Sequence, residues 1–168
     1  ADYADFIASS NAFSQDRRAA DIICLQEFSK DVEGIELVDS LLKSDFKEVY
    51  VREVKESEYA VLRTYSRHKI IDAGSIAGTG RGTTQWVDVL KDDDTIRVFN
   101  NHFYSMSISS ADSADISRGT ILNDGDRVKS IIDRIADNSS VRIDHVDSLR
   151  KVIDATPYRH IVVGDFND

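Results

Sequence analysis

The sequence predicts an α/β sandwich whose sheets contain antiparallel strand pairs. Short apolar runs of strand type are mixed with segments of helical spacing along the 168 residues. Two alternating segments, 84–90 and 96–99, flank the turn sequence KDDD (residues 91–94) and therefore predict an antiparallel hairpin. No internal repeat and no linker divides the chain, so residues 1–168 are expected to form a single domain.

The period of the apolar residues places each element along the chain. Helical spacing is expected over residues 2–10, 34–42, 128–135 and 146–153. Strands are expected at residues 21–26, 49–54, 59–65, 69–76, 84–90, 96–99 and 161–163. The first and last of these strands are continuous apolar runs, which predicts that they are buried. Pro157, the only proline, ends the last helix, and the polar stretch 105–120 predicts a long loop or an insertion.

Two polar segments share features with ligand-binding loops, but their contexts favour ordinary turns. The glycines of AGTGRG (residues 77–82) are spaced like part of a dinucleotide-binding loop. A strand-like segment follows them, however, and not the helix whose N-terminus would meet the phosphates. The aspartates of KDDD lack the spaced ligands of a calcium-binding loop. Both segments are expected to be turns.

Composition narrows the classes of function. The net charge of −9 argues against a protein that grips nucleic acid through phosphates alone, although a divalent cation can supply positive charge locally. The single cysteine, Cys24, excludes an internal disulfide and is expected to be a buried apolar residue. No apolar run approaches the ~20 residues that a membrane-spanning helix needs. Residues 1–10 lack the basic start of a signal peptide.

Polar side chains follow three of the predicted strands. Glu27 follows IICLQ, His102 follows RVFNN, and Asp165 and Asn167 follow IVVG. Glu27 alone is more often a surface or capping residue, and a lone histidine such as His102 is more often a hydrogen-bonded structural residue. If the three strands are neighbours, the four side chains meet at one edge of the sheets and form a set suited to metal-assisted hydrolysis of a phosphoester. No nucleophile elbow and no Cys/His pair supports acyl transfer.

Four segments in this order resemble the endonuclease/exonuclease/phosphatase family of metal-dependent phosphoesterases: ADIICLQEF, TYSRHKI, DTIRVFNNHF and HIVVGDFND. The resemblance covers residues 20–168. It implies a four-layer α/β sandwich with two facing, mainly antiparallel sheets and outer helices, among them residues 128–155.

The resemblance also implies roles for the four side chains. Glu27 would bind the catalytic Mg²⁺ or Mn²⁺, and Asp165 would orient the attacking water and touch the metal. His102 would contact the scissile phosphate, and Asn167 would hydrogen-bond to it. The implied substrates are phosphoesters: nucleic acids, nucleotides, phosphoinositides or phospholipids. Residues 105–127, with Arg118 and Arg127, would select among them, unless these arginines are only solvated charges.

The sequence departs from the family pattern in three places. Asn11 does not match the asparagine of the family's first strand, and Lys69 stands where the family has a proline. The family continues beyond GDFND to a catalytic Ser-Asp-His segment. The resemblance therefore implies an incomplete domain without the first strand and the C-terminal portion, weakly active or inactive by itself. The alternative is a non-catalytic binding or scaffold domain that keeps the fold.

Overall fold

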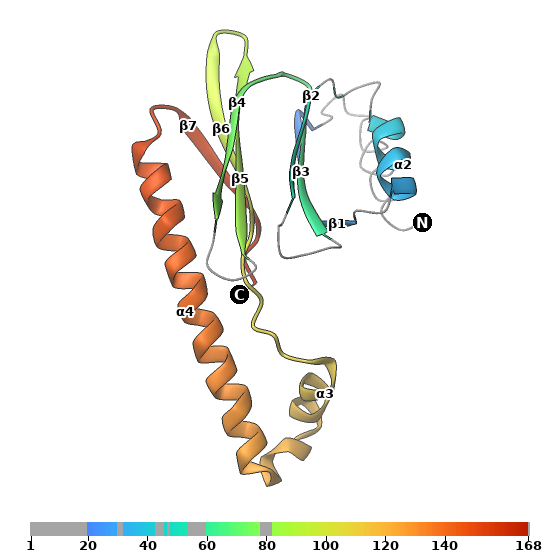
Figure 1. The fold of residues 1–168 in the computed structure, drawn as a ribbon, viewed down its shortest axis with the longest axis vertical. Helices are drawn as coiled ribbons and strands as arrows, with labels where there is room; N and C mark the ends of the chain where they lie inside the picture. Colours follow the sequence, from blue (N-terminus) through green and yellow to red (C-terminus); the bar gives the residue numbers. More distant parts are fainter. Residues whose placement is uncertain are drawn as a thin grey trace.

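Two β-sheets face each other in the computed structural model, which describes residues 20–29, 32–42, 46, 48–53, 60–77 and 82–167 (Figure 1). The first sheet has the order β1-β3-β2 and is antiparallel throughout. Its strands are β1 (Ile22–Ser29), β2 (Glu48–Glu53) and β3 (Ala60–Ser66). The predicted helix at 2–10 and the segment 78–81 of the glycine-rich turn lie outside the described residues.

The second sheet has the order β4-β5-β6-β7, and only its β6–β7 pair is parallel. Its strands are β4 (Lys69–Ala77), β5 (Thr83–Lys91), β6 (Asp94–His102) and β7 (Arg159–Asp165). The predicted hairpin is confirmed: Lys91 pairs with Asp94, and Asp92 adopts the positive φ of 54° that a two-residue turn requires. The residues of this turn are exposed.

Helices cover the outer faces of both sheets, so the domain has four layers, as the fold class predicts (Figure 1). Helix α2 (Val32–Leu42) packs against the first sheet. Its contacts bury Phe28, Val38, Leu42, Phe46 and Tyr65. The C-terminal half of α4 (Gly125–Ala155) covers the second sheet, where Phe99, Phe103 and Leu149 are buried. Each large apolar side chain buried in this way contributes roughly 1.5–3 kcal/mol.

The space between the sheets is filled by valines at one end and by amides at the other. Val87, Val89 and Val98 form the apolar part, against which Ile22 and the partly buried Cys24 pack. The predicted burial of the first and last strands is only partly correct. Residues 22–26 are half-buried, and Ile161 on the edge strand β7 is 49% exposed. Apolar content alone does not distinguish an edge strand from a central one.

The prediction of a long loop or an insertion at 105–120 is only partly correct: residues 105–109 have no regular structure, but helix α3 (Ser110–Arg118) and a 3₁₀ turn at Thr120–Asn123 follow them. The Ser109 hydroxyl caps α3 by accepting from the Asp112 backbone N–H, and Gly119 ends it with φ of 70°. The two helical segments predicted between 128 and 153 are parts of the single helix α4, which has 31 residues. It ends two residues before Pro157.

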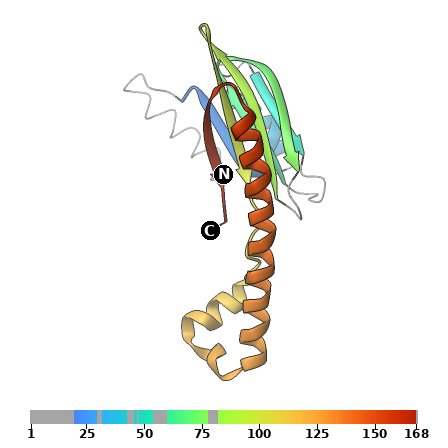
Figure 2. The ribbon, with the colours of Figure 1, turned by 90° about the vertical axis from the view of Figure 1, so that its left-hand side faces the viewer.

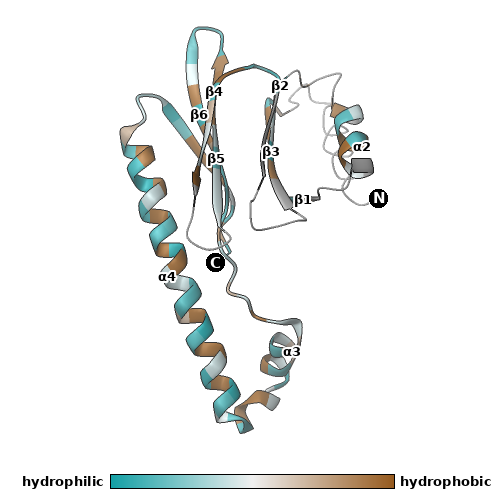
Figure 3. Ribbon diagram, viewed as in Figure 1, coloured by the Kyte–Doolittle hydropathy of each residue, from teal (hydrophilic) through white to brown (hydrophobic). Residues whose placement is uncertain are grey.

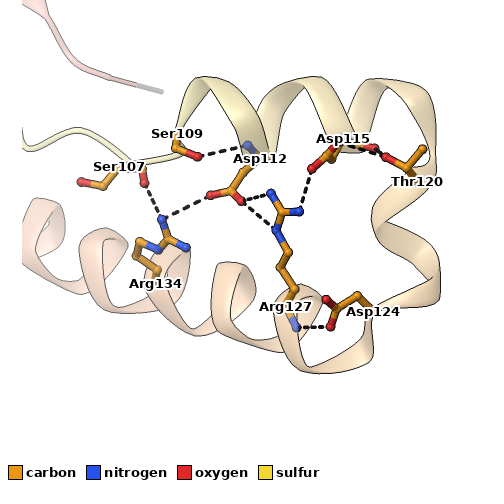
Figure 4. A network of polar contacts seen from close by, with 8 residues as sticks. All are labelled: Ser107, Ser109, Asp112, Asp115, Thr120, Asp124, Arg127 and Arg134. Carbon is orange, nitrogen blue, oxygen red and sulfur yellow. Dashed lines mark hydrogen bonds and ion pairs between the residues drawn. The ribbon is translucent and has the colours of Figure 1, made fainter.

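The N-terminal half of α4, the 3₁₀ turn and α3 form an arm that projects beyond the sheets (Figures 1 and 2). Ion pairs hold the arm together: Arg127 contacts Asp112 at 2.9 Å and Asp115 at 2.7 Å (Figure 4). Hydrophobic and hydrophilic residues are interspersed along the whole of α4 (Figure 3). Among the described residues, no helix is long and apolar enough to cross a membrane.

His145 anchors α4 to the second sheet through a buried hydrogen bond. Its ring is 1% exposed, and Nε2 lies 2.9 Å from the Thr84 hydroxyl oxygen. That hydroxyl donates its only proton to Asn101 Oδ1 at 2.7 Å, so Nε2–H of His145 must be the donor to Thr84. Nδ1 is buried and has no hydrogen-bond partner among the described residues. Burial therefore lowers the pKa of His145, since a second proton would place an uncompensated charge there.

We expect the stability of the domain to fall as the pH drops from 7.5 to 5.5. The pKa of His145 is lower in the folded than in the unfolded chain, so the unfolded chain binds more protons as the pH passes below 6.5. For one proton, the slope reaches at most about 1.4 kcal/mol per pH unit. Urea unfolding at several pH values should show a smaller slope in His145→Gln than in the exposed-site control His160→Gln. Equal slopes in both variants would contradict the prediction.

Candidate active site

The structure brings the side chains singled out in the sequence to one edge of the two sheets. His102 and Asp165 are the last residues of β6 and β7 and are paired in the parallel register. Glu27 belongs to the facing sheet, and its Oε1 lies 3.5 Å from Nε2 of His102. The last residues of two strands of one sheet thus lie beside Glu27, which belongs to β1 of the other sheet. A carboxylate, an imidazole and a second carboxylate lie next to one another there.

The sequence predicted that Glu27 follows the end of its strand. In the structure, a β-bulge inside β1 presents Glu27 instead. The pairing of β1 with β3 shifts between Leu25 and Phe28, and the strand continues to Ser29. Phe28 resumes the pairing because its ring is buried under α2. Glu27 itself has φ of 49°, and its side chain is 67% exposed. The bulge therefore turns one carboxylate out of the sheet, a common use of bulges near active sites.

Asp165 and Asn167 are fixed to the segment that follows His102. The Phe103 backbone N–H donates to the Asp165 carbonyl at 2.8 Å, and the Asn167 side-chain amide donates to the Phe103 carbonyl at 2.7 Å. The Asn167 backbone N–H also donates to Asp165 Oδ1 at 3.0 Å. The Asn167 amide has a second N–H, which suits a phosphate oxygen. The polar end of β7 is thus held in place before any ligand arrives.

A cavity of about 400 Å³ opens beside these residues. It is lined by Asp165, Asn167 and the segment Ser105, Met106, Ser107, Ile108. The backbone around it is strained: of the four non-glycine residues with positive φ in the described part of the chain, three surround this edge. They are Glu27, Ser107 and Asn167. Such a conformation costs about 1–2 kcal/mol per residue and clusters at functional sites.

Sequence reasoning missed the amides that connect the two sheets below this edge. Asn100 is fully buried in β6, and its Oδ1 accepts from Gln26 Nε2 at 2.6 Å. Gln26 precedes Glu27 and Asn100 lies two residues before His102, so this contact ties the two sides of the site together. A signal was present, because amides inside otherwise apolar strands must find partners when they are buried.

The arginines proposed for substrate selection have other surroundings. Arg127 pairs with Asp112 and Asp115 within the arm, so it is a structural ion-pair residue and not a solvated charge (Figure 4). Arg118 is exposed in the last turn of α3. Neither residue lines the cavity.

The carboxylates at this edge, from Glu27 and Asp165, suit a cation that needs few protein ligands. In the described ranges, no group of three or more His, Cys, Asp or Glu side chains could hold a metal ion. Mg²⁺, however, keeps several waters and is usually bound through one or two carboxylates together with substrate phosphate. The exposed carboxylate of Glu27, 3.5 Å from His102 at the edge where β7 ends with Asp165, meets this requirement. A site that encloses its metal entirely in protein ligands does not fit.

Comparison with known proteins gives no match to a family model and none to a curated protein sequence. Solved structures do match. TDP2 of D. rerio complexed with single-strand DNA product has a TM-score of 0.58 at 15% identity, over 98% of this chain and 53% of that chain. The human nocturnin catalytic domain with bound sulfate anion has a TM-score of 0.58 at 13% identity, over 96% and 57% of the two chains.

Sphingomyelinase C from Streptomyces griseocarneus matches with a TM-score of 0.60 at 14% identity, over 98% of this chain and 57% of that one. The chain thus spans about half the length of these proteins, between 53% and 57%. All three are members of the endonuclease/exonuclease/phosphatase superfamily. The resemblance seen in the sequence is therefore confirmed at the level of the fold: over its described part, this chain has the endonuclease/exonuclease/phosphatase fold.

Proposed function

We propose that this chain carries the phosphate-binding and metal-binding half of a divalent-metal-dependent phosphoesterase site. One observation carries the proposal: Glu27, His102 and Asp165, from three strands of two sheets, lie at one edge of the sheets, and Asp165 and Asn167 also line a cavity. Carboxylate, imidazole and amide groups in one place are the set that phosphoester hydrolysis uses. The shared fold of TDP2, nocturnin and sphingomyelinase C supports the same general activity.

Each residue has a role that its position suits. Glu27 would hold Mg²⁺ or Mn²⁺, which supplies charge neutralisation at the phosphate when bound. His102, 3.5 Å from Glu27, would donate a hydrogen bond to a phosphate oxygen. Asp165 would orient the attacking water and accept its proton, and could also touch the metal. Asn167 would donate its second amide N–H to the phosphate and so hold the charge of the transition state.

The substrate is proposed to be a phosphodiester. The solved neighbours name two kinds of diester chemistry, a single-strand DNA product for D. rerio TDP2 and sphingomyelin cleavage in the name sphingomyelinase C. The alternative function, a non-catalytic binding or scaffold domain, is favoured by the lack of a three-residue metal cluster in the described ranges. Such a domain would bind phosphate without turnover.

Replacing Glu27 by glutamine should weaken Mn²⁺ binding at least about tenfold, because the site loses one of its few protein oxygens. The binding is measured by electron paramagnetic resonance of free Mn²⁺ in the presence of inorganic phosphate. Asp93→Asn is the matched control, since it removes an exposed carboxylate in the β5–β6 turn. Equal losses in the two variants, or no loss in Glu27→Gln, would refute the metal assignment.

Hydrolysis of bis(p-nitrophenyl) phosphate separates the two candidate functions. The enzyme proposal expects Mn²⁺-dependent turnover that EDTA abolishes and that Glu27→Gln lowers by about 10²-fold or more. Glu27-dependent phosphate binding without any turnover would favour the binding domain.

A further inference from the structure

The buried imidazole of His145 lies against the residues that support the candidate site, although it is not part of the site itself. A Cβ on Gly82 would come within 2.8 Å of its Nδ1, so the start of β5 leaves just enough room for the ring. On another side the ring lies against Phe103, with the two ring centroids 4.6 Å apart. An imidazole packed this closely has little freedom to move, so it fixes the groups that it contacts relative to α4.

A chain of hydrogen bonds leads from His145 to the strand that carries Asp165. Nε2–H of His145 donates to the Thr84 hydroxyl at 2.9 Å, and that hydroxyl donates to Asn101 Oδ1 at 2.7 Å. The Asn101 amide in turn donates to the Val163 carbonyl at 2.8 Å, two residues before Asp165. Thr84 and Asn101 are both 0% exposed. A partner lost from this chain therefore leaves a buried polar group unpaired, which is costly.

Phe103 provides a second connection between His145 and the polar end of β7. The backbone N–H and carbonyl of Phe103 are the groups that hold Asp165 and Asn167. Its ring contacts the His145 ring and also the ring of Phe166, whose centroid lies 5.2 Å away. Phe166 stands between the two polar residues in the sequence. A shift of the imidazole therefore acts on the same stretch of backbone that presents both polar side chains.

We propose that His145 is a positioning residue for the candidate site, which holds Asp165 and Asn167 from α4 in the place where they meet the phosphate. This inference rests on the proposed phosphoesterase function. His145 is not among the described residues that line the cavity, so it would act without touching the substrate. It acts on β7 through Thr84 and on the neighbouring segment through Phe103. The Nε2–H group is the part of the ring that the hydrogen-bond chain requires.

Three variants of the whole chain separate the donor from the bulk of the ring. His145→Leu fills the space and removes the donor, whereas His145→Gln offers an amide N–H near the position of Nε2. Thr84→Val breaks the same chain of hydrogen bonds from the other side. Val89→Ala is the control for a general loss of stability. Val89 is 2% exposed in the same strand as Thr84, but it lies at the valine-filled end of the space between the sheets.

Two measurements are made on each variant. ¹⁵N-resolved NMR of the chain without metal or phosphate follows the side-chain amide of Asn167, and calorimetry with Mn²⁺ gives the dissociation constant of inorganic phosphate. His145→Leu and Thr84→Val should each move the Asn167 amide resonances and weaken phosphate binding about three- to tenfold. The double variant should lose little more than either single variant, because both break one chain. His145→Gln should bind phosphate within about twofold of the wild type.

The results that would overturn the inference are specific to the site. They are unchanged Asn167 resonances or unchanged phosphate affinity in folded His145→Leu, equal changes in Val89→Ala, or no recovery in His145→Gln. If His145→Leu does not fold, Thr84→Val decides by the same criteria. Each of these outcomes leaves the proposed function standing. If the wild type binds no phosphate with Mn²⁺, the proposed function fails, and the resonances of the metal-free chain still decide whether His145 holds Asn167 in place.

Discussion

Replacing Gly164 by alanine should lower the free energy of unfolding by about 3–5 kcal/mol, enough to unfold a large fraction of a marginally stable domain. A Cβ at this position would overlap the backbone carbonyl oxygen of Asn101 and come within 2.6 Å of its backbone nitrogen. Backbone atoms cannot move aside as a side chain can. The φ of 141° adds strain, because residues with a Cβ rarely adopt it.

The clash also has a consequence for the site. Gly164 pairs with Asn101 in the β6–β7 ladder, directly before the pair of His102 and Asp165. Any shift of β7 that relieves the overlap must therefore move Asp165 relative to His102. Urea unfolding measures the loss of stability. Gly125→Ala is the matched control, because nothing lies within 4 Å of the added Cβ and alanine favours the start of α4. Wild-type stability of Gly164→Ala would contradict the geometry of this strand pair.

The strands could be predicted from the sequence because their signals are local. The hairpin of β5 and β6 was predicted from period-two alternation on either side of the turn at residues 91–94. The alternation and the turn both lie within a stretch of about twenty residues. The order of the strands in each sheet could not be predicted from local signals. That β6 pairs with β7 in parallel, across the whole of α3 and α4, depends on packing between distant segments. The prediction that Glu27, His102 and Asp165 lie close together therefore depended on the resemblance to the phosphoesterase family as well as on the pattern of apolar strands followed by polar residues.

Helix α3 was missed because its stability does not come from an apolar face. Its capping residues, Ser109 and Gly119, are visible in the sequence and could have marked both ends. The interaction that holds it is not visible. Asp112 pairs with Arg127 and Arg134, which lie 15 and 22 residues further along the chain. Sequence patterns record which residues are apolar, and they do not record which charges will be neighbours.

The candidate site was predictable in its residues and not in its geometry. Glu27 was recognised as a carboxylate near a strand end, but the bulge that exposes it depends on Phe28 returning to the pairing with β3. The wall of the cavity at 105–108 lay inside the stretch expected to be a loop. Its position depends on donors from α4, which approach it only in the folded chain.

Among the residues of the site, the buried amides between the sheets are expected to contribute most to the free energy of unfolding. Asn100 is 0% exposed, and its amide nitrogen lies within hydrogen-bond distance of four oxygens. These oxygens belong to Leu25, Arg63, Thr64 and Gln85, from both sheets. Its own oxygen accepts from Gln26 at 2.6 Å. The two N–H groups of one side chain thus face acceptors on three other strands, and this contact ties the sheet that carries Glu27 to the sheet that carries His102.

Replacing Asn100 by aspartate should therefore lower the free energy of unfolding by about 3–5 kcal/mol at neutral pH. The change is nearly isosteric, but it puts an anionic oxygen where the amide N–H groups faced four oxygens.

Burial and these acceptors must raise the pKa of the new carboxyl, so the folded variant binds a proton more readily than the unfolded chain. Its stability should consequently improve as the pH falls through that raised pKa, because the protonated acid can donate one hydrogen bond. The wild type is expected to follow the opposite trend, because protonation of His145 is disfavoured in the folded chain. Urea unfolding at pH 8 and pH 5 tests both signs, and Asn123→Asp, at an exposed position of the 3₁₀ turn, should change stability by less than about 0.5 kcal/mol. If Asn100→Asp and Asn123→Asp have equal stabilities at pH 8, the amide of Asn100 does not hold the two sheets in register.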